Sequence, residues 1–250
     1  MKTVLEDLFH LDRHISRYFA GSISVIFVSY LVYLFFKEDT VNKLGREDGL
    51  FEYLTALSFL IASVIFFVLF LNQKKIVYVF FALIFFIGMG EEISWGQRIF
   101  NYGTPEYFKE KNIQNELNLH NLELFDSKNI EGEYKSGISY ILSINFLYKL
   151  FWLVYGLILP VVYSFSVIVK NAANKISLPV PPIILGSLFI INWTICKVML
   201  TYLLPDGRSD QYYYSVGEIR EFGAAFIFMI LGVYFYQTTA KGRRQMIMIT

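Results

Sequence analysis

The sequence has little cysteine, little histidine and almost no net charge, and each shortage excludes a class of protein. The one cysteine, Cys196, cannot form a disulfide within the chain or build a cysteine-based metal motif. The 22 lysines and arginines nearly balance the 21 acidic residues, which leaves a net charge of +1. Without a basic excess the chain lacks the electrostatic attraction that nucleic-acid binding requires, so no nucleic-acid partner is expected.

Internal repeats and low-complexity tracts are also missing, and we predict a single domain over residues 1–250. A cleavable signal peptide is not expected either. Residues 1–19 are polar and amphipathic, and the apolar run that follows is too long and has no small-residue cleavage site. This pattern is typical of a first membrane span that stays in the protein.

Apolar residues, in contrast, dominate the chain. Hydrophobic residues make up 55% of it and aromatic residues 18%, and the mean hydropathy is +0.47. A soluble domain of this length needs far more polar surface, so we expect the lipid bilayer to be the chain's main partner. Because lipid cannot hydrogen-bond to exposed backbone groups, only helices are expected to cross it.

Six segments are long enough to cross a bilayer as helices, which takes about 20 apolar residues each. They cover residues 20–36, 49–71, 76–100, 144–169, 180–204 and 217–239. The sequence therefore predicts an all-α fold, a polytopic membrane helix bundle of about six transmembrane helices. The longest connection is 101–137, and Pro160 is expected to kink the fourth span.

The distribution of the basic residues predicts the orientation of the protein in the membrane. Six crossings place both tails on one side of the membrane, together with connections 72–75 and 170–179. The longer loops on the opposite side carry eight basic residues. The side of the tails carries ten: Lys2, Arg13, Arg17, Lys74, Lys75, Lys170, Lys175, Lys241, Arg243 and Arg244. Positive charge in short loops favours the cytoplasm. We therefore expect both termini in the cytoplasm, loop 101–137 outside it, and the cell's inner or plasma membrane as the location.

Charged residues inside the predicted spans gather in the outer half of the membrane. They are the acids Glu52, Glu91, Glu92, Glu218 and Glu221 and the bases Arg98, Lys149, Lys197 and Arg220. Each costs about 2.5–3.5 kcal/mol on insertion scales, so such charges usually face a bundle interior or a wet cavity. Glu52 and Glu218 lie near predicted helix starts, where the helix dipole alone can account for an acid. Glu91 and Glu92 follow apolar residues 76–90, which favours a functional or buried-network role for them.

The stretch from Gly90 to Arg98 contains several of these features. On a helix, Glu91, Ser94, Trp95 and Arg98 would share one face. Arg98 would then pair with Glu91 or with an acid on a neighbouring helix. Trp95 has a second interpretation, as an aromatic residue at the membrane–water interface.

The loop that follows supplies further polar groups, Glu116, Asn118 and His120. On a strand all three would point the same way, and on a helix Glu116 and His120 would lie one turn apart. His120 is the only histidine beyond the N-terminal tail. A lone histidine is more often structural than functional, but beside several acids it can act as a base or a metal ligand.

These features define the candidate site residues. The expected catalytic residues are Glu91, Glu92, His120 and Arg98. The expected substrate-binding residues are Trp95, Gln97, Asn118 and Asn121. If the protein holds a divalent metal ion, its expected ligands are Glu92, Glu116, His120 and Glu221.

Two resemblances bear on this pattern. Residues 90–98, followed by 118–121, resemble a pattern of uncharacterised bacterial multi-pass membrane proteins. The paired Glu91 and Glu92 are similar to the paired glutamates of the CPBP intramembrane proteases. In that family an arginine follows the second glutamate by four positions and histidines lie on later helices, whereas Arg98 follows by six and no later span has a histidine. The second resemblance implies a glutamate-based membrane hydrolase.

Three classes of function fit the sequence. The one we favour is a hydrolase or transferase that acts on a lipid, lipid-linked or peptide substrate at the outer interface. In one mechanism a metal ion activates the attacking water. In the other, Glu91 and Glu92 act as acid and base, because two neighbouring carboxyl groups resist ionising together and one of them would stay neutral. In a further arrangement, Ser94 is the nucleophile and His120 is the base that activates it.

The second class is an ion- or proton-coupled transporter, since intramembrane acids also relay protons and cations. Small size and the lack of a repeat count against it, although a homo-oligomer would supply symmetry. The third class is a structural membrane subunit with a buried polar network. We favour the enzyme because the charges lie on one side, whereas a carrier needs polar access from both.

Overall fold

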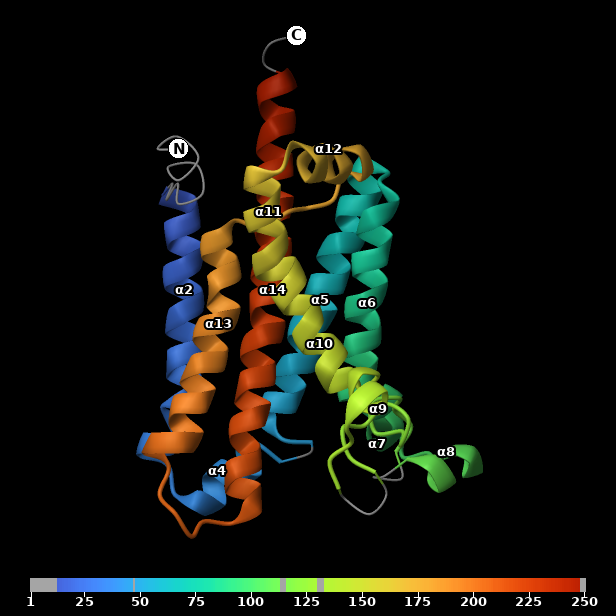
Figure 1. Cartoon of the computed structure of the whole chain (residues 1–250), viewed down its shortest axis with the longest axis vertical. Helices are drawn as coiled ribbons and strands as arrows, with labels where there is room; N and C mark the ends of the chain where they lie inside the picture. The colour runs from blue at the N-terminus through green and yellow to red at the C-terminus, as the bar shows by residue number, and fades with distance from the viewer. Residues whose placement is uncertain (1–12, 47, 113–115, 130–132, 248–250) are drawn as a thin grey trace.

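The computed structural model of the chain consists of helices packed side by side along one long axis (Figure 1). It describes residues 13–46, 48–112, 116–129 and 133–247, except for the side chains of Arg98 and of 241–247. Within that part no strand forms, and the only extended pairings are two isolated bridges, Asn112–Leu122 and Lys128–Tyr134. The predicted all-α fold is confirmed.

The long helices run along this axis. They are α2 (Arg13–Tyr30) with α3 (Val32–Phe35), α5 (Leu50–Gln73), α6 (Ile76–Glu92), α10 (Ile144–Leu153) with η2 (Val154–Ile158) and α11 (Leu159–Phe165), α13 (Ile183–Val198) with η3 (Met199–Leu203), and α14 (Asp210–Ile247). Four stretches of the described chain are long and apolar enough to cross a membrane: Arg13–Phe35, Leu50–Gln73, Ile144–Phe165 and Ile183–Leu203. The predicted count of six spans is therefore not confirmed.

The shorter helices lie at the two ends of the bundle (Figure 1). One end, here called the loop end, carries α4 (Glu38–Leu44), α7 (Gln97–Phe100), α8 (Glu106–Lys111) and α9 (Gly137–Ile141). At the other, here called the tail end, α2 begins, α14 ends, and α12 (Val167–Ile176) lies across the bundle. The first and last described helices thus start and finish at the same end, as expected for the two tails.

The third predicted span, 76–100, is wrong in its last third, because α6 already ends at Glu92. Ser94, Trp95 and Gly96 have φ values of +45°, +54° and +82°. Such left-handed residues cannot continue a right-handed helix, and of the three only glycine adopts this conformation without steric cost. The short turn η1 (Ser94–Gly96) therefore directs the chain into α7 and away from the bundle axis.

The fourth span is also shorter than its predicted range, 144–169. Pro160 lies at the start of α11, and because proline has no N–H to donate, the preceding turn η2 widens into a π-helix. The helix ends at Phe165, and α12 is a separate surface helix. Gly156 of η2 faces Gly186 of α13, where a Cβ atom on Gly186 would collide with the Gly156 backbone. The two glycines therefore permit these segments to touch.

Aromatic side chains fill the inside of the bundle between the charged side chains near the loop end, on one side, and the tail end, on the other. This aromatic layer consists of Phe66, Phe81, Phe85, Phe151, Phe189 and Phe228. Its rings are in contact, with centroids 5.1 Å apart for Phe85 and Phe228 and 4.7 Å apart for Phe189 and Phe228. Phe228 lies two turns beyond Glu221 along α14, or about 10 Å toward the tail end. The layer therefore fills the inside of the bundle on the tail-end side of Glu221.

At the loop end, α4 is tied to the turn before α14. The Glu38 carboxylate accepts hydrogen bonds from the Ser209 hydroxyl at 2.7 Å and N–H at 2.9 Å, and from Arg208 at 3.0 Å. The Ser209 donors, helped by Arg208, hold the pKa of Glu38 below its usual range. This clamp holds the α3–α4 corner beside the start of α14.

Candidate functional site

Glu91, in the last turn of α6, holds the loop that follows. One carboxylate oxygen accepts a hydrogen bond from Trp95 Nε1 at 2.8 Å, and the other accepts from the N–H groups of Leu119 and His120 at 2.6 and 2.9 Å. The Nδ1 atom of His120 lies 3.4 Å from the second oxygen. The structure thus brings Glu91 and His120 together as expected. Because each oxygen already has a donor, the geometry gives Glu91 the role of an anchor.

A second set of hydrogen bonds joins η1 to the same loop. Ser94 Oγ donates to Glu116 at 2.7 Å, and Asn118 Nδ2 donates to the same oxygen at 2.8 Å. The expected grouping of Glu116 with His120 does not form, because 116–121 is neither strand nor helix. Instead Glu116 turns toward Ser94 and His120 toward Glu91.

The four predicted substrate-binding residues all take part in this attachment or lie buried inside it. They are Trp95, Gln97, Asn118 and Asn121. Gln97 accepts from the Leu117 N–H at 2.6 Å and donates to Thr104 at 2.6 Å. Asn118 and Asn121 are 2% and 6% exposed. These contacts hold the loop against α6, and substrate binding by the four residues stays a prediction.

The predicted helical face of Glu91, Ser94, Trp95 and Arg98 is wrong, because α6 ends before Ser94. Glu91 and Trp95 nevertheless meet, since the left-handed turn folds the indole back over Gly90, where a Cβ atom would lie 2.9 Å from the ring. The side chain of Arg98 lies outside the described residues, so its catalytic role and its pairing stay predictions.

Glu92 faces α14 and α5 instead of the loop. It lies within electrostatic reach of Glu221, Glu218 and Glu52. Glu218 is 9% exposed, and Glu221 pairs with Arg220 at 2.7 Å. In the part of the chain that the structure describes, the Glu92 carboxylate makes no hydrogen bond or ion pair. We call Glu92, Glu218 and Glu221 the carboxylate cluster.

The predicted metal ligands are not brought together. Glu116 and His120 are bound on the loop side, whereas Glu92 and Glu221 belong to the carboxylate cluster. Among the described residues no three His, Cys, Asp or Glu side chains are placed so that they could hold a metal ion. These donors do not fit a divalent metal, and no step of the chemistry is assigned to one.

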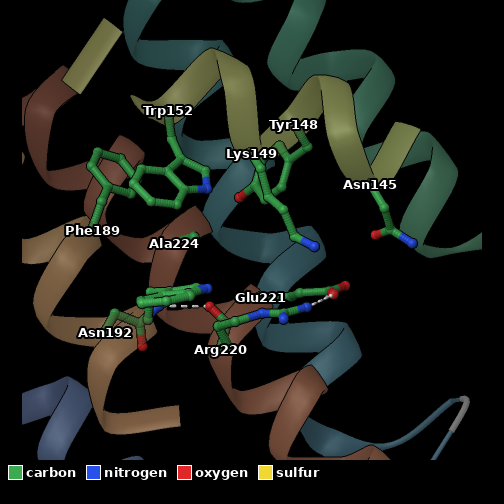
Figure 2. Close-up of a pocket in the computed structure, with 10 residues that line it drawn as sticks. Asn145, Tyr148, Lys149, Trp152, Phe189, Asn192, Arg220, Glu221 and Ala224 are labelled. Carbon is green, nitrogen blue, oxygen red and sulfur yellow. Dashed lines mark hydrogen bonds and ion pairs between the residues drawn. The ribbon is translucent and has the colours of Figure 1, made fainter. Parts of the chain in front are cut away.

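A pocket lies beside the carboxylate cluster, between α10, α13 and α14 (Figure 2). Its walls include Tyr148, Lys149, Trp152, Trp193, Arg220 and Glu221. In Figure 2 the amino group of Lys149 points toward the Arg220–Glu221 pair. The hydroxyl of Tyr148 is buried, has no hydrogen-bond partner in the described chain, and lies within electrostatic reach of Glu221 and Glu92. Glu221 therefore links the pocket to the cluster.

Lys149 and Arg220 were expected in the polar layer without a role, and Asn192 was not expected to take part. The signal for Asn192 in the sequence is a lone amide inside an apolar run. Asn192 Nδ2 donates to the backbone oxygen of Arg220 at 2.7 Å, and its Oδ1 accepts from the Tyr30 hydroxyl at 3.2 Å. Gly223 permits this contact, because a Cβ atom there would meet the Asn192 amide. These bonds fix the register of α13 against α14 at the level of the pocket.

The fold and the site together define the class: an all-helical chain with helices able to cross a membrane and a polar site in one half of the bundle. No protein-family model, curated protein or solved structure matches the chain.

Proposed function

We propose that this chain is a membrane-embedded enzyme, a hydrolase or transferase that acts on a lipid, lipid-linked or peptide substrate by acid–base chemistry. In this proposal α6 and α14 complete six crossings of the inner or plasma membrane, and the loop end faces away from the cytoplasm. One observation carries it. The Glu92 carboxylate has no partner in the described chain and lies within electrostatic reach of Glu221, which lines a pocket.

Glu92 and Glu221 supply the acid and the base. Neighbouring carboxyl groups repel one another when both are ionised, which favours one neutral acid beside one carboxylate, so that one donates a proton while the other accepts. The base takes a proton from water or from an attacking hydroxyl, and the acid protonates the leaving group. Lys149 and the Tyr148 hydroxyl, at the wall of the same pocket, stabilise negative charge on the reacting group.

Glu91 and His120 act on the other side of the α6 end, as positioning residues. Their contacts hold residues 116–121 against the turn that follows Glu92. The paired glutamates of the CPBP resemblance would then have divided roles, one at the reacting centre and one in the scaffold.

The aromatic layer supports an enzyme over a carrier. A carrier must open its polar site alternately to both sides of the membrane. Here Phe85, Phe189 and Phe228, each no more than 2% exposed, pack between the carboxylate cluster and the tail end. The aromatic layer thus separates the polar site from the tail end.

The test of this function is turnover by the purified chain in vesicles of bacterial lipid extract. Lipids and added peptides are followed by mass spectrometry over time, beside protein-free vesicles. We expect at least one lipid species to be consumed and a product to appear. Lipid and peptide spectra that stay identical with and without folded protein would contradict the proposal.

The orientation is tested with two cysteine variants at exposed lysines, Lys109→Cys on α8 at the loop end and Lys175→Cys on α12 at the tail end. The wild type is the background control, because its only cysteine, Cys196, is 1% exposed. A membrane-impermeant maleimide applied to intact cells should label the Lys109→Cys variant and reach the Lys175→Cys variant only after lysis. The opposite pattern would place the loop end in the cytoplasm.

A further inference from the structure

The pocket between α10, α13 and α14 carries more positive than negative charge, with Lys149 and Arg220 set against Glu221 (Figure 2). We propose that it binds the phosphate group of an anionic lipid. This inference rests on the proposed function, since it names the substrate class for the same site.

Three donors are available to such a phosphate. Arg220 uses one nitrogen for Glu221, at 2.7 Å, which leaves other N–H groups of its guanidinium for a ligand. Lys149 is half-buried and makes no hydrogen bond or ion pair with the described residues. The buried Tyr148 hydroxyl likewise has no partner there. Arginine and lysine donors converging on one space are the usual recognition of a phosphate.

The size of the pocket favours a lipid over a soluble molecule. The pocket encloses a space of about 390 Å³ that is partly open to the outside. A ligand can therefore insert a small polar group while its bulk stays outside the helices. A lipid has this shape, with its chains left in the membrane.

The walls and the depth agree with this assignment. Trp152 stacks on Phe189 with centroids 5.8 Å apart, and Trp193 of α13 and Leu150 of α10, 40% and 43% exposed, extend the apolar faces beside the pocket. Lys149 lies five residues after the start of α10, or about 8 Å from the loop end of that helix. The charged side chains thus lie close to the level of lipid head groups, with apolar surface toward the chains.

Lys197 provides a matched control for charge. It lies on α13 in the same half of the bundle, is exposed, and places its ammonium group 5.9 Å from the centroid of the Trp193 ring. It does not line the pocket. General attraction of basic residues to anionic lipid would involve Lys197 as much as Lys149, whereas a phosphate site involves only Lys149.

The experiment measures binding of short-chain dioctanoyl phosphatidic acid to the full-length purified chain by native mass spectrometry. Dioctanoylglycerol, which lacks the phosphate, and inorganic phosphate are the comparison probes. We expect Lys149→Gln to weaken phosphatidic acid binding about tenfold and Lys197→Gln to change it less than about twofold. Dioctanoylglycerol should bind weakly, and inorganic phosphate should not compete at equal concentration.

If Lys149→Gln and Lys197→Gln weaken phosphatidic acid binding equally, or if dioctanoylglycerol binds as tightly as phosphatidic acid, the phosphate site is overturned. Competition by inorganic phosphate at equal concentration would overturn the lipid as its source. The assay does not depend on turnover. Phosphatidic acid binding that is lost in Lys149→Gln, without turnover of any lipid, would support the site and refute the enzyme. Lipid turnover with unchanged binding in Lys149→Gln would refute the site and support the enzyme.

Discussion

Glu92→Gln is expected to lower turnover by about 100-fold or more while leaving a folded protein. Glutamine keeps the size of the side chain but can neither release nor take up a proton. The Glu92 carboxylate has no hydrogen bond or ion pair within the described chain, so its loss removes no contact that holds the fold. Removing one of several neighbouring acids also relieves repulsion, so the melting temperature should stay equal or rise.

Glu52→Gln is the control for charge alone. Glu52 contributes to the same electrostatic field, but its carboxylate accepts a hydrogen bond from the Asp48 N–H at the start of α5. It has no place in the pocket, so at least half of the wild-type turnover should remain. Turnover in Glu92→Gln at the wild-type rate, or a Glu92→Gln protein that no longer folds, would remove Glu92 from the reacting centre.

Glu91→Gln is expected to release the loop rather than stop the chemistry directly. The two Glu91 oxygens accept from donors on opposite sides, Trp95 on one and the Leu119 and His120 N–H groups on the other. A glutamine has only one oxygen, so its NH₂ group must face a donor on one side. Losing a charge-assisted hydrogen bond costs about 2 kcal/mol, or about thirtyfold in the opening of the loop.

Hydrogen exchange followed by mass spectrometry measures this opening at the amides of Leu119 and His120. Glu92→Gln is the matched control, a neighbouring glutamate with the same substitution and no hydrogen bond to the loop in the described chain. We expect exchange there to accelerate in Glu91→Gln and to stay unchanged in Glu92→Gln. Equal protection of these amides in Glu91→Gln and wild type would show that Glu91 does not anchor the loop.

Much of the fold could be predicted from the sequence, because long apolar runs allow few structures other than helices. The end of α6 could not. Past Glu92 the sequence continues with the large apolar residues Ile93, Trp95, Ile99 and Phe100. Only Gly96 hints at the three left-handed residues that follow the end of the helix. A turn of this kind depends on the bonds that Glu91 and Ser94 make with a loop some 25 residues away, which a local pattern does not contain.

The site shows the same limit. The position of the charges along each helix indicated a polar layer, and the structure places Glu92, Glu221, Arg220 and Lys149 in one half of the bundle. Which of these charges contact the loop and which face the pocket could not be predicted, because adjacent residues such as Glu91 and Glu92 point about 100° apart on a helix. One turns to the loop and the other to α14. Which face meets which neighbour depends on how the helices pack.

The place where a lipid binds distinguishes the pocket between α10, α13 and α14 from every other surface of the bundle. The wild-type chain in vesicles is exposed to a phosphatidic acid analogue with a photoreactive group near the phosphate, and the labelled peptides are identified by mass spectrometry. We expect labelling on α10, α13 and the segment of α14 around Arg220, which excess unlabelled phosphatidic acid prevents. Displaceable labelling confined to the loop around Glu116 and His120, or labelling spread evenly over all helices and not displaced, would contradict it.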